Sequence, residues 1–126
     1  MQDSYLALIK FILPEYILDH FELKSVKEQP GSSTLEIQLE EPNVIPAEFG
    51  EGKYYSKGFY PEITIQDFPL RGHRVFLVVK RRRWMKMDGE EKGSIITRDW
   101  NVVSKGTRMT KEFAAFLKEC RRYPAI

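Results

Sequence analysis

The sequence predicts an α+β fold, with a small, mostly antiparallel β-sheet, two N-terminal helices and one C-terminal helix. In the middle of the chain, apolar and polar residues alternate over short segments, as they do in half-buried strands. Near both ends, apolar residues instead recur at three- and four-residue spacing, as in amphipathic helices. A chain of 126 residues has the length of one domain. We assign residues 1–21 to a helical N-terminal segment, residues 22–103 to the sheet and residues 107–123 to the C-terminal helix.

The N-terminal segment predicts two short helices separated by a proline. Residues 3–13 can form the first helix, with Ser4 as its cap. Pro14 ends that helix and can open the next one at its first position. Neither helix is long enough to be stable alone, so both should pack on the sheet or on a partner. His20 is expected to be a surface or partly packed residue.

The next part of the chain predicts a hairpin followed by a loop. Residues 21–28 and 33–40 flank the turn residues Pro30-Gly31-Ser32. In the second of these segments apolar residues alternate with Glu and Gln, so one face of the hairpin should be exposed to solvent. Residues 41–57 contain prolines and glycines with little periodicity, and predict a loop.

Residues 58–84 predict two strands around a tight corner. Pro69 is expected to set the turn, and Gly72 to supply a positive φ. The second strand, residues 74–84, is apolar on both faces in its middle. This pattern predicts a central strand that is covered on both sides.

The remaining elements are a returning strand and a final helix. Residues 94–100 predict the strand, after the turn dipeptide Asp88-Gly89, with Ile96 and Trp100 inward. Residues 104–107 predict a loop. The helix, residues 110–123, has Thr107 or Thr110 as its cap, and its apolar stripe is Phe113, Phe116, Leu117 and Cys120. Cys120 is therefore expected to be a buried packing residue.

Composition excludes several kinds of site. One cysteine allows no internal disulfide, and with two histidines it gives no recognised zinc-ligand spacing. No apolar run has the length of a membrane span, and the N-terminus lacks a basic signal-peptide region. We expect a cytoplasmic protein with no metal, no cofactor and no membrane association.

The sequence also predicts that the protein is not an enzyme. It contains no glycine-rich phosphate loop and no Ser/His/Asp set. Asp67, Asp99 and Glu112 could be considered as three metal-binding carboxylates, but nothing fixes their geometry. Asp67 fits better as an acceptor of backbone N–H groups at its turn.

Charge divides the chain into an acidic and a basic half. Residues 1–70 hold 5 Lys+Arg and 12 Asp+Glu, a net charge of −7, whereas residues 71–126 hold 15 and 6, a net charge of +9. This asymmetry indicates a nucleic-acid-binding face, although a solvated surface whose charges balance on folding gives the same count. Aromatic residues precede the basic strand, and they either stack on bases or plug the edge of a core.

Four consecutive cations, Lys80 to Arg83, end the apolar strand. Neighbouring side chains on a strand point to opposite faces, so Lys80 and Arg82 should face one way and Arg81 and Arg83 the other. We predict phosphate contacts mainly from these cations and from others near them in the basic half. The predicted DNA-binding residues are Arg71, Arg74, Lys80, Arg81, Arg82, Arg83, Arg98, Arg108 and Lys111.

Four segments resemble the N-terminal region of certain bacterial insertion-sequence transposases. They are Tyr60-Pro-Glu-Ile-Thr-Ile-Gln-Asp-Phe-Pro-Leu-Arg-Gly, Arg81-Arg-Arg-Trp, Arg98-Asp-Trp and Lys105-Gly-Thr-Arg-Met-Thr-Lys-Glu-Phe. In such elements this region can be a separate small reading frame ahead of the one that encodes the DDE catalytic domain. The resemblance covers most of the chain and is strongest over residues 57–117.

A more distant similarity is to the zinc-finger domain of related transposases. There a strand of the form Gly-x-x-Val-x-Leu-x-x-x-x-Arg-Arg-aromatic leads into a cysteine. Here Gly72, Val75, Leu77, Arg82, Arg83 and Trp84 take those places, but Met85 stands where the ligand cysteine would be. A zinc-less version is implied, in which Trp84 is buried and packing around it replaces the metal.

The resemblance implies a non-catalytic DNA-binding accessory region. It would hold the terminal repeats of the element for a separately encoded catalytic transposase subunit, and homodimerisation is left open. The alternative is a protein-interaction or oligomerisation module of the transposase, without direct DNA contact.

Overall fold

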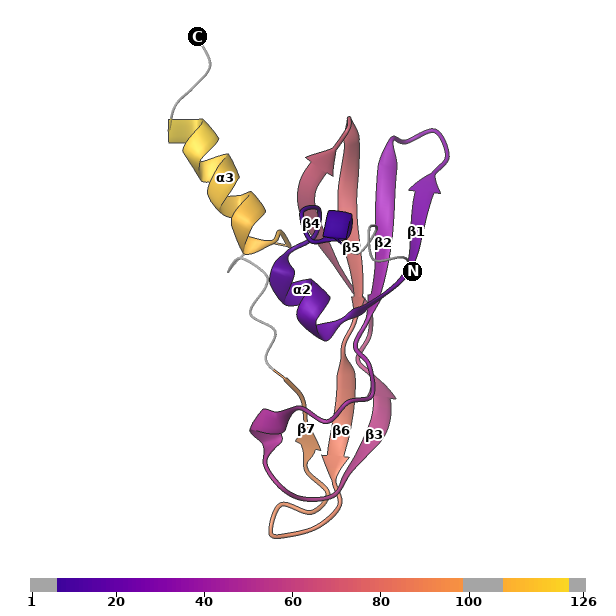
Figure 1. Ribbon diagram of the computed structural model, residues 1–126, viewed down its shortest axis with the longest axis vertical. Coiled ribbons are helices and arrows are strands. Elements are labelled where there is room, and N and C mark those ends of the chain that lie inside the picture. Colours follow the sequence, from indigo (N-terminus) through magenta and orange to yellow (C-terminus); the bar gives the residue numbers. More distant parts are fainter. Residues whose placement is uncertain (1–6, 99–107, 123–126) are drawn as a thin grey trace.

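The computed structural model describes residues 7–98 and 108–122, and it confirms the α+β fold. The strands form two sheets, one of four strands and one of three, instead of a single sheet. The two sheets follow one another along the long axis of the molecule, as Figure 1 shows. None of the described helices combines the length and the apolar character that crossing a membrane requires.

The four-stranded sheet contains the predicted hairpin and the central apolar strand. Its strands are β1 (Glu22–Gln29), β2 (Thr34–Glu40), β4 (Ile63–Leu70) and β5 (His73–Lys80), in the order β1-β2-β5-β4. β2 and β5 pair in parallel, and the other pairs are antiparallel. β5 is therefore a central strand, as its apolar sequence predicts.

The main core lies where the N-terminal helical segment covers one face of this sheet. In α2 (Glu15–His20) Ile17 is completely buried, and Phe21 follows it into the core. They pack with the inward residues of the sheet, among them Leu39 and Leu77. Pro14 is the residue before this helix and not its first helical residue. The preceding helix ends at Ile9 among the described residues, earlier than predicted, because tight turns carry the chain on to Pro14.

The three-stranded sheet consists of β3 (Tyr54–Phe59), β6 (Arg82–Lys86) and β7 (Ile95–Ile96), in the order β3-β6-β7. All of its pairs are antiparallel. The prediction of a loop over residues 41–57 is thus wrong at its end, which forms most of β3. The loop also contains a single 3-10 turn, η1 (Ala47–Phe49).

The segment predicted as one long strand, residues 74–84, is two strands. It breaks at Arg81, between β5 and β6, and its pairing partners change there. On one side of the break β5 pairs with β2 and β4, and on the other side β6 pairs with β3 and β7. The run of cations therefore lies at the junction of the two sheets.

The corner between β4 and β5 differs from the prediction as well. Pro69 lies within β4, an edge strand, where a missing N–H group is tolerated. The two turn residues are Arg71 and Gly72, with φ of 52° and 78°. Positive φ at both central residues is what a type I′ two-residue hairpin turn requires.

The C-terminal helix, α3 (Lys111–Arg122), is capped as predicted. The Thr110 hydroxyl oxygen accepts a hydrogen bond from the Phe113 N–H at 3.3 Å. Phe113 is buried, but Phe116 is half-exposed and Cys120 is exposed, so the prediction of a buried Cys120 is wrong. The reason is that α3 meets β4 near its start and then runs away from the sheet (Figure 1).

Several predictions lie outside the described residues. They concern the first part of the N-terminal helix, Asp99, the inward Trp100, the loop at residues 104–107 and the Thr107 cap.

Candidate nucleic-acid interface

The four consecutive cations diverge to opposite faces, which confirms the predicted alternation. The Lys80 ammonium and the Arg82 guanidinium lie 5.8 Å and 4.4 Å from the ring centre of Phe59. The Arg81 and Arg83 guanidinium groups lie 5.1 Å and 5.6 Å from the ring centre of Tyr60. Phe59 therefore contacts the two cations on one face of the chain, and Tyr60 contacts the two on the other face.

A bulge at Gly58 places these two rings on opposite faces. In the β3–β6 pair Ser56 is opposite Trp84 but Phe59 is opposite Arg82, so β3 contains one extra residue. Gly58 has a φ of 82°, a conformation that costs any other L-residue energy. Because of this extra residue, Phe59 faces the same way as Arg82, and Tyr60 faces the other way.

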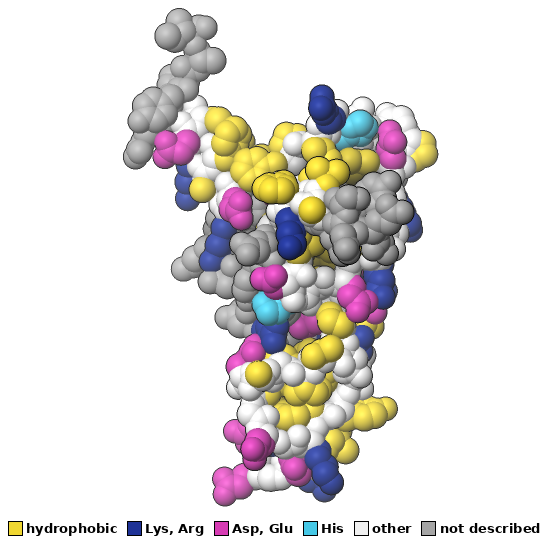
Figure 2. Space-filling model, viewed as in Figure 1, with side chains coloured by type: hydrophobic (Ala, Val, Ile, Leu, Met, Phe, Trp, Pro, Cys, Tyr) yellow, Lys and Arg dark blue, Asp and Glu magenta, His cyan; other side chains and the backbone are white. Residues whose placement is uncertain are grey.

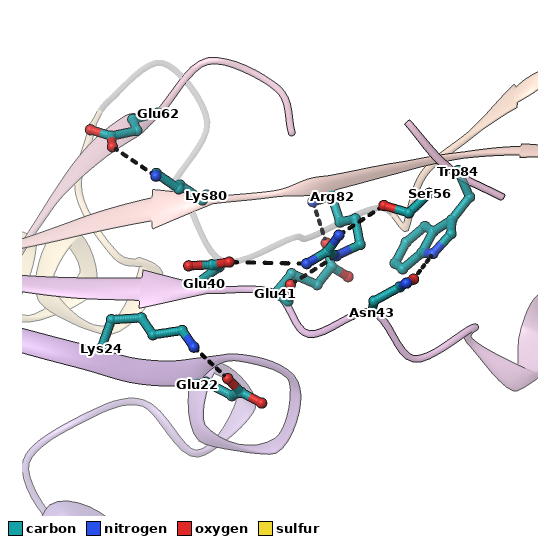
Figure 3. A network of polar contacts seen from close by, with 10 residues as sticks. All are labelled: Glu22, Lys24, Glu40, Glu41, Asn43, Ser56, Glu62, Lys80, Arg82 and Trp84. Atoms are coloured by element: carbon teal, nitrogen blue, oxygen red, sulfur yellow. Dashed lines mark hydrogen bonds and ion pairs between the residues drawn. The ribbon is translucent and has the colours of Figure 1, made fainter. Parts of the chain in front are cut away.

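Arg82 belongs to an internal network at the junction, shown in Figure 3. Its backbone N–H donates to the Glu41 carboxylate at 2.8 Å, and its side-chain Nε donates to the Glu41 carbonyl oxygen at 3.1 Å. A terminal nitrogen donates to the Ser56 hydroxyl at 2.8 Å, and Glu40 lies 4.0 Å away. Glu41 is buried, and the Arg82 backbone N–H supplies its carboxylate with a hydrogen bond that replaces one from water.

The same inward face contains Trp84, which is completely buried, as predicted. Its indole N–H donates to the Asn43 side-chain oxygen at 3.0 Å, and its ring meets the Phe49 ring edge-on at 5.6 Å. Both partners come from the segment predicted only as a loop. In Figure 1 this segment, residues 41–50, runs along one face of the three-stranded sheet.

The opposite face of the three-stranded sheet has exposed side chains, among them Tyr55, Lys57 and Ile95, and we call it the outer face. Alternation along the strands and their register assign its side chains. One cross-strand row is Tyr55, Met85 and Ile95, and the next contains Lys57 and Arg83. Beyond that row, Tyr60 and Arg81 lie at the junction of the two sheets. At the opposite end of the three-stranded sheet, Lys53 immediately precedes β3. The outer-face residues are Lys53, Tyr55, Lys57, Tyr60, Arg81, Arg83, Met85 and Ile95.

The charge of the outer face is all of one sign. It has four cations, and none of its described residues is acidic. Within the described residues, no carboxylate pairs with Arg81 or Arg83, and Arg83 donates only to the Lys57 carbonyl oxygen at 3.2 Å. The Nε atoms of both arginines are buried without a hydrogen-bond partner among the described residues. Their charge is thus not neutralised within that part of the chain.

The other predicted DNA-binding residues are not brought to this face. Arg71 and Arg74 are exposed at the far end of the four-stranded sheet. Arg81 follows Arg74 by seven residues along the chain, about 23 Å at about 3.3 Å per residue. Lys80 is 3.8 Å from Glu62.

The last three predicted residues occupy two further places. Arg98 contacts His20 and pairs with Glu48, so it ties β7 to α2 and η1. Arg108 and Lys111 are exposed at the start of α3. The predicted residues therefore form several groups, of which only Arg81 and Arg83 belong to the outer face.

The three carboxylates considered as metal ligands do not form a site within the described residues. Asp67 is buried and accepts a hydrogen bond from the Thr110 hydroxyl at 2.8 Å. Burial raises its pKa, against the opposing effects of the Phe68 N–H and of Thr110. No group of three or more His, Cys, Asp or Glu residues between positions 7–98 and 108–122 is arranged to hold a metal ion.

Comparison with known family models, curated proteins and solved structures found no match to this chain.

Proposed function

We propose that this protein is a non-catalytic DNA-binding accessory of an insertion-sequence transposition system. In this proposal its outer face holds the DNA phosphates while a separately encoded subunit performs catalysis. The observation that supports it best is the outer face, whose assigned side chains include four cations and no carboxylate. Asp88 lies at its edge and accepts a hydrogen bond from the Lys53 backbone N–H at 3.2 Å. The transposition context rests on the sequence resemblance.

The geometry of the face suits contact with phosphates. Arg81 and Arg83 are two residues apart on one side of the chain, about 6.6 Å along the strand direction. Cation–π contacts with the Tyr60 ring restrict both guanidinium groups, which reduces the side-chain entropy lost on binding an anion. Phosphate contacts of this kind orient a protein on DNA without reading its sequence.

Loss of charge from the face is the test. Arg81→Ala combined with Arg83→Ala should weaken binding of a labelled terminal-repeat duplex, measured by fluorescence anisotropy. The matched control is Lys27→Ala combined with Lys118→Ala, which removes the same charge from exposed positions on β1 and α3. Equal weakening by both variants would mean that net charge, and not this face, governs binding.

One observation favours the alternative, a protein-interaction module. Apolar side chains remain exposed where α3 meets the four-stranded sheet, as Figure 2 shows. Phe11 is 90% exposed and Phe116 is 50% exposed beside an open groove of about 520 Å³ that Phe68 and Leu70 help to line. In this alternative, the catalytic transposase subunit would bind to the apolar groove beside α3. If the protein binds that subunit and no DNA at any salt concentration, the alternative replaces our proposal.

A further inference from the structure

We infer that the outer face binds unpaired nucleotides, with Tyr55 as the platform on which a base stacks. This inference rests on the proposed function and names the form of nucleic acid that the site takes. It assigns a separate role to the apolar row of the face, which contact with phosphates alone does not require.

Tyr55 is the exposed aromatic residue of that row, at its β3 end. Its side chain is 59% exposed, and it lies in register with Met85, which in turn is in register with Ile95. Ile95 is itself 48% exposed. An aromatic ring beside apolar side chains offers a base a flat surface whose burial removes apolar area from water.

The cations lie where the backbone of a stacked nucleotide would run. The row of Lys57 and Arg83 follows that of Tyr55 by two residues, about 6.6 Å along the strands. The Lys57 ammonium now lies 5.8 Å from the centre of the Tyr55 ring. An exposed cation–π contact is worth roughly 0.5–1 kcal/mol, whereas base–aromatic stacking is worth roughly 1–3 kcal/mol. A base can therefore displace Lys57 from the ring toward the adjacent phosphate.

Tyr55 and Tyr60 differ in this respect. Two arginines already contact Tyr60, so its ring serves to orient them. Tyr55 is left as the stacking surface. A duplex hides the faces of its bases, so only unpaired nucleotides, such as a frayed element end, can use Tyr55.

The test compares Tyr55→Leu with Tyr55→Phe on a single-stranded oligonucleotide and on its duplex. Leucine keeps apolar bulk but removes the ring, whereas phenylalanine keeps the ring. We expect Tyr55→Leu to weaken single-strand binding roughly tenfold and duplex binding much less, and Tyr55→Phe to change single-strand binding little. Circular dichroism establishes that both variants are folded.

The possible outcomes separate this inference from the proposed function. If duplex binds and responds to the Arg81 and Arg83 substitutions, but Tyr55→Leu leaves single-strand binding unchanged, stacking is refuted and the proposed function stands. If no nucleic acid binds, both fail. Equal competition by inorganic polyphosphate would show charge recognition alone, and would also refute stacking. An RNA oligonucleotide of the same sequence distinguishes single-stranded RNA from single-stranded DNA as the ligand. Tighter binding of the RNA would overturn the assignment to DNA.

Discussion

The Arg82 guanidinium lies 4.4 Å from the ring centre of Phe59, on the face of the chain opposite to that of Arg81 and Arg83. Arg82 and its two neighbouring arginines therefore have different surroundings, although they are consecutive in the sequence. Arg82 interacts with Glu41 and Ser56 at the junction of the sheets, whereas its two neighbours stack on Tyr60 at the outer face. This division underlies the predictions that follow.

Arg82→Ala should destabilise the protein by roughly 2–3 kcal/mol, since it removes the charged donor of the Glu41 carbonyl oxygen and of the Ser56 hydroxyl. Arg81→Ala is the matched control and should cost much less, because the Arg81 side chain makes no hydrogen bond or ion pair to the described residues. Urea denaturation of both variants measures the difference. In a double-mutant cycle, Ser56→Ala should reduce the cost of Arg82→Ala. Equal midpoints for the two arginine variants would contradict a structural role for Arg82.

Gly58→Ala should lower the free energy of unfolding by about 1–2 kcal/mol, because alanine is strained in the left-handed backbone of the bulge. A Cβ atom added at Gly58 meets nothing within 4 Å, so no steric clash adds to this cost. The same holds at Gly31, with a φ of 76°, in the turn between β1 and β2.

Gly31→Ala is therefore a control of matched conformational cost. Both variants should lose similar stability, but only Gly58→Ala should weaken DNA binding, since only that bulge sets the directions of Phe59 and Tyr60. If both variants bound DNA like the wild type, the bulge would have no part in shaping the interface.

Trp84→Ala should destabilise the protein by roughly 3–5 kcal/mol, the usual range for a fully buried large aromatic residue. The substitution removes the contact with Phe49 and leaves the Asn43 side-chain oxygen without its donor. Chemical denaturation measures the loss. A midpoint close to that of the wild type would show that packing around Trp84 does not support the three-stranded sheet.

Asp67 should make the stability depend on pH in the direction opposite to that of a salt-bridged carboxylate. Burial raises the pKa of Asp67 in the folded protein, so the folded state retains its proton at a pH where the unfolded state has lost it. Stability should then fall as the pH rises from the ordinary aspartate pKa through the raised folded value.

Asp67→Asn removes this titration while keeping an oxygen acceptor for the Thr110 hydroxyl. The unfolding free energy of the Asp67→Asn variant relative to that of the wild type should therefore increase over that pH interval and stay constant above it. Denaturation of the two proteins across a pH series measures the difference. A difference that is independent of pH would show that the Asp67 pKa is not raised.

Local periodicity predicted the strands of the four-stranded sheet, the capped final helix and the alternation of Lys80 to Arg83, because each depends on neighbouring residues. The break at Arg81 depends on pairing with distant strands, which no short pattern encodes. Gly58 was predicted only as the start of the strand-forming stretch 58–84, and its role in a bulge became visible only through the register of Ser56 and Phe59. For Cys120, helical spacing identified the apolar stripe but could not show whether another element covers it.

The outer face itself was only partly predictable. The sequence pointed to Arg81 and Arg83, but Lys53, Lys57 and Tyr55 lie some 25 residues earlier, in what read as a loop. Sheet pairing between β3 and β6 brings them together. Arg82 shows the converse, since its sequence context resembles that of its neighbours although its contacts are internal.

The measurement that tests the outer face most directly is an NMR titration of the isotope-labelled protein with a short DNA carrying an unpaired end. We predict that amide shifts change for the outer-face residues, foremost Tyr55, Lys57, Tyr60, Arg81, Arg83 and Met85, and that raising the salt concentration reverses the changes. Amides of β1 and of α3 should stay in place. Shift changes confined to α3 and the groove beside it, or none at low salt, would contradict the account.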